Sequence, residues 1–272
     1  MPELPEVETT CRGIAPHTEQ KNIASMTVRN GRLRWPVLPE LPAKLKGRQL
    51  LAVSRRAKYL LLRFDIGTLL VHLGMSGSLR IVAPDADIGK HDHIDVAFND
   101  GTTLRYNDPR RFGAFVWHEG DDVSTSKLLS HLGPEPLSEA FTENDLYQRA
   151  QGSTQPIKSF IMDAKVVVGV GNIYANEALF AAGIHPLKAA NKLTRPKAQL
   201  LVAAIKTILA HAIERGGTTL RDFVGGDGKP GYFAQELHVY GQGGKPCSVC
   251  AKSLTEKRLQ NRTTVYCTHC QR

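Results

Sequence analysis

The chain has 272 residues, 42% of them hydrophobic, which is long enough for two domains and predicts a folded globular protein rather than a disordered one. Lys and Arg (35) outnumber Asp and Glu (26), and the resulting net charge of +9 favours a polyanionic partner such as nucleic acid, although a basic protein without such a partner has the same composition. No apolar run approaches the roughly 20 residues that span a bilayer, and no signal-peptide pattern is present, so we expect a cytoplasmic protein with reduced thiols and no membrane contact.

The first predicted element is a helix over residues 2–17, PELPEVETTCRGIAPH. Proline is tolerated in a first helical turn, and glutamate favours the positive end of the helix dipole. Val7, Cys11 and Ile14 fall on one face at helical spacing. Cys11 is therefore predicted to be a small core residue.

The same stretch carries residue types suited to amine catalysis. If Met1 is removed, Pro2 becomes an N-terminal secondary amine, and α-amines have a pKa of about 8. Attack of such an amine on a sugar aldehyde carbon gives a cationic iminium, an electron sink for elimination, and Glu3 can carry protons beside it. A helix that merely begins with proline and acidic residues explains the same letters, and these residues alone leave both interpretations open.

From about Ser54 to Glu119 the pattern changes to short strands separated by turn residues. Asn99-Asp100-Gly101 is typical of a hairpin turn. Many short strands with turns between them predict a β-sandwich or barrel. The expected strands are YLLLRF, TLLVHL, SLRIV, HIDVAF, TTLRY and GAFVWH.

Two of the turns in this region carry side chains that could enter a base stack. HLGMSG presents Met75, an unbranched apolar residue, and DPRRFG (residues 108–113) presents two arginines and a phenylalanine. Apolar side chains inserted between base steps kink DNA. Ordinary hairpin ends are the alternative for both turns.

Beyond residues 131–137, HLGPEPL, which resemble a linker, the chain is predicted to be helical. We expect helices over 157–165 and 172–183, joined by Val-Gly-Val-Gly, and a third over 194–217. The helix start at Asn172 offers backbone N–H groups and a dipole that suit a phosphate, although most such connections are only turns.

The tail holds the strongest metal pattern in the chain. Cys247-x2-Cys250 is followed after 16 residues by Cys267-x2-Cys270. Two such pairs complete a tetrahedral thiolate site, so the tail predicts one structural Zn²⁺ ion with no position open to water, on a β-hairpin. A redox dithiol is the weaker alternative. Cationic and amide side chains between the pairs suit a groove of DNA, and an exposed, solvated ribbon is the alternative.

These motifs together resemble those of bacterial formamidopyrimidine-DNA glycosylases, in that family's order and over the whole chain. The start Pro-Glu-Leu-Pro favours this family over its sister family of endonuclease VIII type, which starts Pro-Glu-Gly-Pro. The motifs are PELPEVE, RRAKYLL, HLGMSG, DPRRFG, GVGNIYANE, GKPGYFAQELHVYG and the four-cysteine tail.

The resemblance implies an α+β multidomain fold. A β-sandwich with a leading helix would cover residues 1–131, a helix-two-turn-helix domain 132–236 and a zinc finger 237–272. A loop over 218–240 would close over the everted base. The implied activity is that of a monomeric base-excision-repair enzyme that binds damaged double-stranded DNA, excises 8-oxoguanine and formamidopyrimidines, and cleaves the strand by β,δ-elimination.

The resemblance also assigns catalytic roles by position. Pro2 would be the Schiff-base nucleophile at C1′, with Glu3 as proton donor to the sugar and Glu6 supporting the site from the same helix face. Lys58 in RRAKYLL would be the proton donor for β-elimination. Arg262 would serve δ-elimination and hold a phosphate beside the lesion.

The remaining implied residues contact DNA. Met75, Arg110 and Phe112 would fill the gap left by the flipped base, with Arg110 facing the orphaned cytosine. His91 and Lys158 would contact the DNA, and Asn172 would bind a phosphate.

One stretch departs from the family pattern. Some relatives carry a run of lysines before the equivalent of Ile157-Lys158, where this chain reads Gln-Gly-Ser-Thr-Gln-Pro. The phosphate contact near Gly152 and Ser153 therefore depends on a different local sequence, whereas Lys158 is present.

Two other interpretations explain part of the sequence. A zinc-ribbon protein that binds nucleic acid without catalysis accounts for the charge and the cysteines. It does not account for the Pro-Glu start, Lys58 and DPRRFG together. An endonuclease VIII-like enzyme for oxidised pyrimidines would share the chemistry and differ in base preference.

Overall fold

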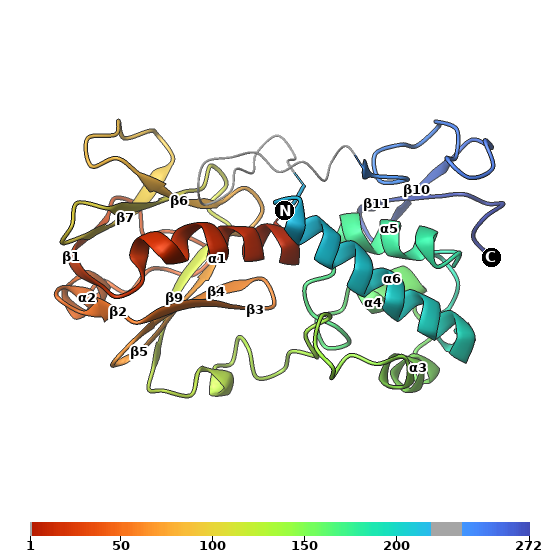
Figure 1. Ribbon diagram of the computed structural model, residues 1–272, viewed down its shortest axis with the longest axis horizontal. Helices are drawn as coiled ribbons and strands as arrows, with labels where there is room; N and C mark the ends of the chain where they lie inside the picture. Colours follow the sequence, from red (N-terminus) through yellow and green to blue (C-terminus); the bar gives the residue numbers. More distant parts are fainter. Residues whose placement is uncertain (1, 219–235) are drawn as a thin grey trace. The chain divides into compact units, whose positions relative to one another are not determined.

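The computed structural model describes residues 2–218 and 236–272 (Figure 1). These residues form two compact units. The first unit contains the chain up to Ser130 together with residues 215–218, and the second contains His131–Glu214 and residues 236–272. The three domain ranges expected from the sequence stay a prediction.

The first unit is a β-sandwich, as predicted. Its two antiparallel sheets have the strand orders β2-β1-β7-β8-β6 and β3-β4-β5-β9. One continuous apolar core, with Leu60, Ile94 and Phe115 among its members, fills the unit. The strands are β1 (Lys21–Val28), β2 (Gln49–Leu50), β3 (Ala52–Arg56), β4 (Tyr59–Phe64), β5 (Gly67–His72), β6 (Ser78–Val82), β7 (Asp92–Phe98), β8 (Thr103–Asn107) and β9 (Ala114–Glu119).

The sequence prediction that strands begin near Ser54 was wrong at its lower bound. β1 starts at Lys21 and pairs with β7, and its register shifts between Ile23 and Ser25. This irregularity breaks the two-residue alternation of buried and exposed side chains by which a strand is recognised in a sequence. A short helix, α2 (Leu41–Leu45), follows β1.

The leading helix, α1, spans Leu4–Thr18. Val7, Cys11 and Ile14 are buried along one face and join the sandwich core, which confirms the predicted helical stripe. The Cys11 thiol donates to the Val53 carbonyl at 3.7 Å, and burial raises the pKa of Cys11 to about 11. Cys11 is therefore a protonated core residue and not a reactive thiolate.

The second unit contains the predicted helices and one more. α4 (Ile157–Ile161) is shorter than expected, while α5 (Asn172–Ala181) and α6 (Arg195–Glu214) match the predicted stretches. The additional helix, α3 (Glu143–Gln151), buries only Leu146 and Ala150, so its apolar stripe is too thin to be recognised from the sequence.

The cysteine-rich tail forms the predicted hairpin, β10 (Thr255–Leu259) paired with β11 (Arg262–Tyr266). Gln260 and Asn261 connect the strands with φ of 47° and 61°, as a two-residue type I′ turn requires. A small apolar cluster, which includes Val239, Leu254 and Val265, lies beneath the hairpin. The tail belongs to the same compact unit as α3–α6.

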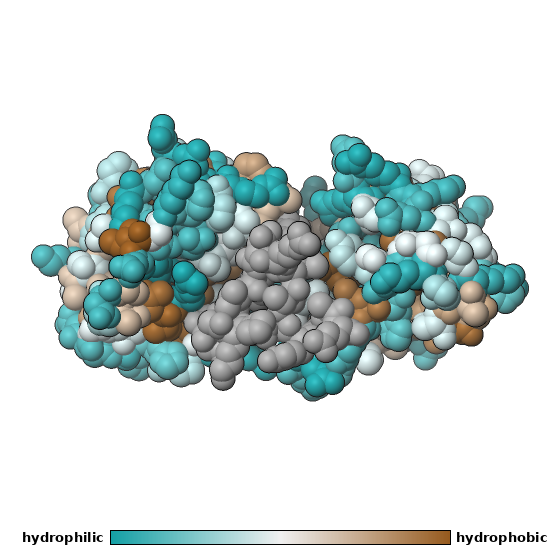
Figure 2. Space-filling view, turned by 90° about the horizontal axis from the view of Figure 1, so that it is seen from above, coloured by the Kyte–Doolittle hydropathy of each residue, from teal (hydrophilic) through white to brown (hydrophobic). Residues whose placement is uncertain are grey.

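The surface seen in Figure 2 is mostly hydrophilic, with small separate hydrophobic areas. Met75 and Phe112 are among the exposed apolar side chains, at 40% and 47% exposure. Within residues 2–218 and 236–272, no helix has the length and apolar character needed to cross a membrane.

Candidate active site

The start of α1 is buried, including Pro2 and Glu3. Glu6, only 2% exposed, organises it: its Oε2 accepts from the Glu3 backbone N–H at 2.8 Å and its Oε1 accepts from the Thr218 N–H at 2.8 Å. Gly217, with φ of +81°, leaves room for this carboxylate, because a Cβ there would lie 3.1 Å from Glu6 Oε1. Glu6 thus fixes the backbone that carries Pro2 and Glu3.

Lys58 lies in the two-residue turn between β3 and β4, where Arg56 pairs with Tyr59. The preceding Ala57 has φ of 54°, a left-handed conformation that such tight hairpin turns use. Tyr59, the residue after Lys58, pairs with His72 at the end of β5. The resemblance assigned a role to Lys58 but no local structure, and the structure places it in this turn.

His72 is a residue that sequence reasoning missed. Its Nδ1 accepts from the Gly74 N–H at 2.9 Å, and its ring meets the Tyr59 ring edge-on at 4.9 Å. Burial, followed by the nearby charges of Lys58 and Arg34, lowers the pKa of His72 to about 4. A neutral imidazole held beside a lysine therefore belongs to this site, and the HLGMSG motif in which it lies was the available signal.

The structure brings together the three side chains expected to fill a base gap. The turn that carries Met75 packs against the DPRRFG loop so closely that a Cβ on Gly74 would lie 2.5 Å from the backbone of Phe112 and Gly113. The Arg110 guanidinium lies 4.8 Å from the centre of the Phe112 ring. We call Met75, Arg110 and Phe112 the wedge residues.

His91 is half-buried in the loop before β7. Its backbone carbonyl accepts from the Asp108 N–H at 3.0 Å, which joins it to the DPRRFG loop. Its ring lies 6.3 Å from that of His93.

In the second unit, Lys158 and Arg262 line one pocket of about 200 Å³. Lys158 is only 1% exposed, and its Nζ donates to the Thr263 carbonyl at 2.9 Å and to Thr264 Oγ1 at 2.8 Å. These bonds hold β11, which begins at the exposed Arg262, against α4. Lys158 therefore positions the hairpin, a role that its sequence motif did not reveal.

Asn172 opens α5 after Gly171, and its buried Oδ1 has no hydrogen-bond partner in the part of the chain that the structure describes. Its neighbour Asn176 donates to the Asn172 carbonyl at 2.6 Å and accepts from the Val265 N–H at 2.9 Å. Asn176 thus ties the helix start to β11. Sequence reasoning did not identify it, since only tertiary contact reveals the link.

Ser153 lies elsewhere in the second unit. It follows α3, where its backbone pairs with Ala150 and Asn191, and it does not line the pocket of Lys158 and Arg262. The expected loop over 218–240 lies for the most part outside the described residues, because 219–235 are not among them.

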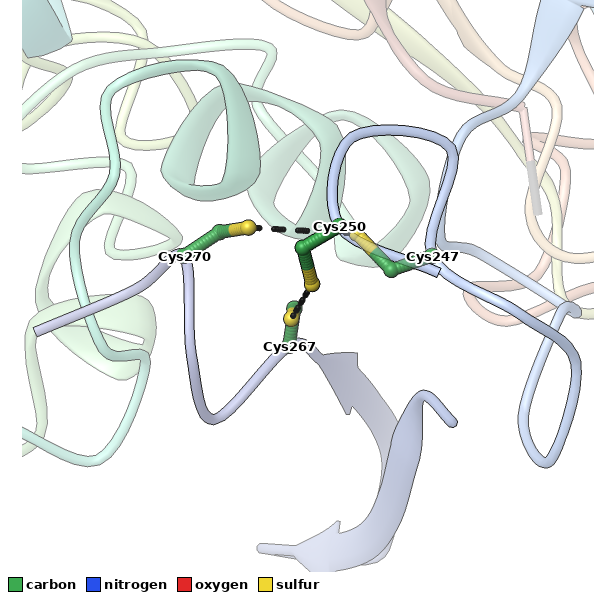
Figure 3. A group of neighbouring side chains, drawn as sticks. All are labelled: Cys247, Cys250, Cys267 and Cys270. Atoms are coloured by element: carbon green, nitrogen blue, oxygen red, sulfur yellow. Dashed lines mark hydrogen bonds between the residues drawn. The ribbon is translucent and has the colours of Figure 1, made fainter. Parts of the chain in front are cut away.

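The four tail cysteines converge as predicted, with their sulfur atoms pointing toward one another (Figure 3). Their ligand atoms all lie within 4.8 Å of one another. The Sγ–Sγ distances of Cys250–Cys267 and Cys247–Cys270 are 3.4 and 4.0 Å. A tetrahedron with Zn–S bonds of about 2.3 Å places its sulfur atoms roughly 3.8 Å apart, so the donor set fits a tetrahedral metal ion.

Comparison with protein families decides the relationship. The model of the formamidopyrimidine-DNA glycosylase N-terminal domain matches residues 1–115, and that of the formamidopyrimidine-DNA glycosylase H2TH domain matches residues 132–224. The chain belongs to the formamidopyrimidine-DNA glycosylase family. Formamidopyrimidine-DNA glycosylases of Teredinibacter turnerae and Saccharophagus degradans are 62% and 58% identical to it over 272 residues, with both chains covered completely.

Solved structures of this family have the same fold. A complex between Lactococcus lactis Fpg and DNA with an abasic site is 35% identical, with a TM-score of 0.93 and 99% of each chain covered. A second complex of that enzyme, with DNA containing N7-benzyl-Fapy-dG, has the same identity and TM-score and covers both chains completely. MutM (Fpg) from Thermus thermophilus is 37% identical, with a TM-score of 0.89 over 99% of this chain and 98% of that one.

Proposed function

We propose that this chain excises oxidised purines, 8-oxoguanine and formamidopyrimidines, from double-stranded DNA and then cleaves the strand by β,δ-elimination. Family membership over the full length carries the proposal. The solved Fpg complexes with abasic and Fapy-containing DNA support it, as does the net charge of +9, because a basic protein binds the phosphate backbone.

Pro2 is the proposed nucleophile and Glu3 the proposed proton donor. After removal of Met1, the Pro2 amine attacks C1′, the bond from C1′ to the base breaks, and the base leaves with the proton that the amine loses. The bond from C1′ to the ring oxygen then breaks, which gives a cationic iminium. Glu3 delivers the proton to the sugar oxygen. The buried helix start, with its backbone fixed by Glu6, supports this assignment, because an amine held in one place reacts faster than a mobile one.

Lys58 and Arg262 are the proposed proton donors for the two strand-cleaving steps, Lys58 for β-elimination and Arg262 for δ-elimination. The neutral state of His72 supports the role of Lys58, because the lysine is then the cationic proton donor of this pair. The bonds from Lys158 to β11 support the role of Arg262, because they give its strand a defined place.

The wedge residues are proposed to fill the gap that the flipped base leaves, with Arg110 opposite the orphaned cytosine. Extrusion of a base costs a few kcal/mol, and side chains that replace its stacking offset that cost. His91 and Asn172 are proposed contacts to DNA. A direct contact by Lys158 has less support, because it is 1% exposed and bonded to β11, and we propose that it acts by positioning the hairpin. The contact at Ser153 has less support, because that residue lies apart from the Lys158–Arg262 pocket.

The four cysteines are proposed to hold one structural Zn²⁺ ion. A site with four thiolates has no open position, so the ion would contribute folding energy rather than catalysis. Its effect would be to tie Cys247 and Cys250 to the end of β11, the strand that begins with Arg262.

Borohydride trapping tests the proposed reaction. The untagged protein is incubated with a duplex that holds 8-oxoguanine opposite cytosine, borohydride is added, and the adduct is mapped by mass spectrometry. We expect a covalent adduct on the peptide that begins at Pro2. The matched control is the same protein with a blocked N-terminus, which should bind the duplex and form no adduct. Tight binding without an adduct, in protein whose Pro2 amine is shown to be free, would refute the proposal for this lesion, and a duplex with an oxidised pyrimidine would then be compared.

A further inference from the structure

Asp108, the first residue of DPRRFG, is a completely buried carboxylate between the two wedge turns, with 0% exposure. Its Oδ1 accepts from Ser76 Oγ at 2.9 Å and from the Arg110 N–H at 3.2 Å. Its Oδ2 accepts from the Tyr106 hydroxyl and the Gly113 N–H, both at 2.9 Å. A carboxylate has about four lone-pair positions, and all four are used.

These four bonds reach both turns that carry the wedge residues. Ser76 directly follows Met75, and Arg110 contributes its own backbone N–H. Gly113 directly follows Phe112. Each wedge residue is therefore bonded to Asp108 itself or adjacent in sequence to a residue that is.

The backbone of Asp108 extends the connection to the histidine loop. Its N–H donates to the His91 carbonyl at 3.0 Å, and its carbonyl oxygen lies 2.8 Å from His93 Nε2. One residue thus links three loops of the first unit for which DNA contacts are proposed.

Tyr106, whose hydroxyl donates to this carboxylate, is itself closely surrounded. Its side chain is fully buried, and its ring packs edge-on against Phe115 at 4.9 Å. A Cβ on Gly113 would lie 1.7 Å from the Tyr106 hydroxyl, and a Cβ on Gly77 would lie 2.8 Å from it. Burial, followed by the charge of Asp108, raises the pKa of Tyr106, so the hydroxyl remains a donor.

Asp95 provides a contrast within the same sandwich. Its carboxylate is 8% exposed and is paired with the guanidinium groups of Arg29 and Arg105 at 2.6 and 2.9 Å. The four bonds of the Asp108 carboxylate described above come instead from neutral donors, two hydroxyls and two backbone N–H groups. Burial of a carboxylate among neutral donors costs free energy, and here it gives a fixed arrangement of loops.

We propose that Asp108 is a positioning residue for lesion excision: it holds Met75, Arg110 and Phe112 as one preformed wedge. The inference rests on the proposed function, since it concerns the same reaction. It predicts that loss of the carboxylate impairs base extrusion and the recognition of the opposite cytosine more than it impairs the chemistry at an abasic site.

The variant Asp108→Asn tests this. The amide has the same shape, but its NH2 group replaces one carboxylate oxygen and would face two hydrogen-bond donors. Single-turnover excision of 8-oxoguanine opposite cytosine and opposite adenine, and cleavage of a preformed abasic site, are measured for each variant. All rates are normalised to the active fraction found by borohydride trapping. We expect excision opposite cytosine to slow at least about tenfold, the preference for cytosine over adenine to shrink, and abasic-site cleavage to stay within about threefold of the wild type.

Asp95→Asn is the matched control, the same change at another buried aspartate. It should change neither the ratio of excision to abasic-site cleavage nor the preference for cytosine over adenine. Ser76→Ala removes one of the four donors and serves if Asp108→Asn does not fold. We expect its excision rate to fall by a smaller factor, about threefold, relative to abasic-site cleavage. Equal slowing of all three reactions in the folded Asp108 or Ser76 variants, or an unchanged preference for cytosine, would overturn the proposal. A wild-type protein without a trapped adduct would instead refute the underlying function, so the two failures are distinguishable.

Discussion

Glu177 provides the sharpest stability prediction for the second unit. It lies on α5 and is 3% exposed, and its carboxylate accepts three backbone N–H bonds: from His238 at 2.9 Å, Val239 at 3.0 Å and Tyr240 at 2.8 Å. The carboxylate thereby holds against the helix a segment whose middle residue, Val239, is 62 positions away in the sequence. These bonds, together with the Phe180 ring stacked on His238, attach the start of the cysteine-rich tail to α5.

The magnitude follows from the geometry. Oε1 accepts from Val239 and Tyr240, while Oε2 accepts from His238. Glu177→Gln therefore keeps one oxygen as an acceptor and turns its amide N–H toward a backbone N–H. Loss of one hydrogen bond to a charged group costs about 1.5–3 kcal/mol. Glu177→Ala removes all three acceptors and leaves a cavity, and we expect about 3–5 kcal/mol.

Chemical denaturation with two probes measures this effect. Both tryptophans, Trp35 and Trp117, lie in the first unit, so their fluorescence reports that unit, whereas most helical ellipticity at 222 nm comes from α3–α6. We expect the Glu177 variants to shift the ellipticity transition and to leave the fluorescence transition in place. Glu214→Gln, at a side chain that is 76% exposed, is the control and should change stability by less than about 0.5 kcal/mol. An ellipticity transition of Glu177→Gln within that same margin would refute the reasoning.

Three further predictions concern other parts of the chain. Gly113→Ala should destabilise the first unit by about 1–3 kcal/mol, because its Cβ would overlap the Tyr106 hydroxyl, whereas Gly152→Ala, with its nearest atom at 3.8 Å, should be nearly neutral; thermal unfolding compares them. The pKa of His72, about 4, lies below its ordinary value of 6.5, so the unfolded chain binds that proton more readily, and the contribution of His72 to stability should be complete above pH 6.5 and decline as the pH falls toward 4. An NMR titration follows the imidazole directly, and Lys58→Met should raise the pKa of His72. An unchanged pKa would contradict the part of the shift that is assigned to the charge of Lys58. Removal of metal by a chelator should loosen β10–β11 and weaken DNA binding without moving the tryptophan transition, and a chelated protein with unchanged DNA affinity would show that the metal is dispensable.

Local patterns were sufficient for much of the fold. The leading helix, the hairpin at Asn99-Asp100-Gly101 and the zinc-type hairpin depend on residues close in the sequence, whose preferences for turns and helices act over a few positions. The two cysteine pairs were recognised for the same reason. β1 and α3 were missed, since a bulge and a thin apolar stripe remove the periodicity that such patterns require.

The candidate site shows more clearly which features the local sequence predicts and which depend on tertiary contacts. The sequence by itself determined which residue types stand at Pro2, Glu3 and Lys58, and the order of its motifs determined the family. Only the tertiary structure decided how those residues are held: Glu6 reaches Thr218, Lys158 reaches β11, and the Asp108 carboxylate joins turns that are 32 positions apart. The physical reason is that a buried polar group must find partners wherever the fold supplies them, and no local pattern records which distant donor or acceptor that will be.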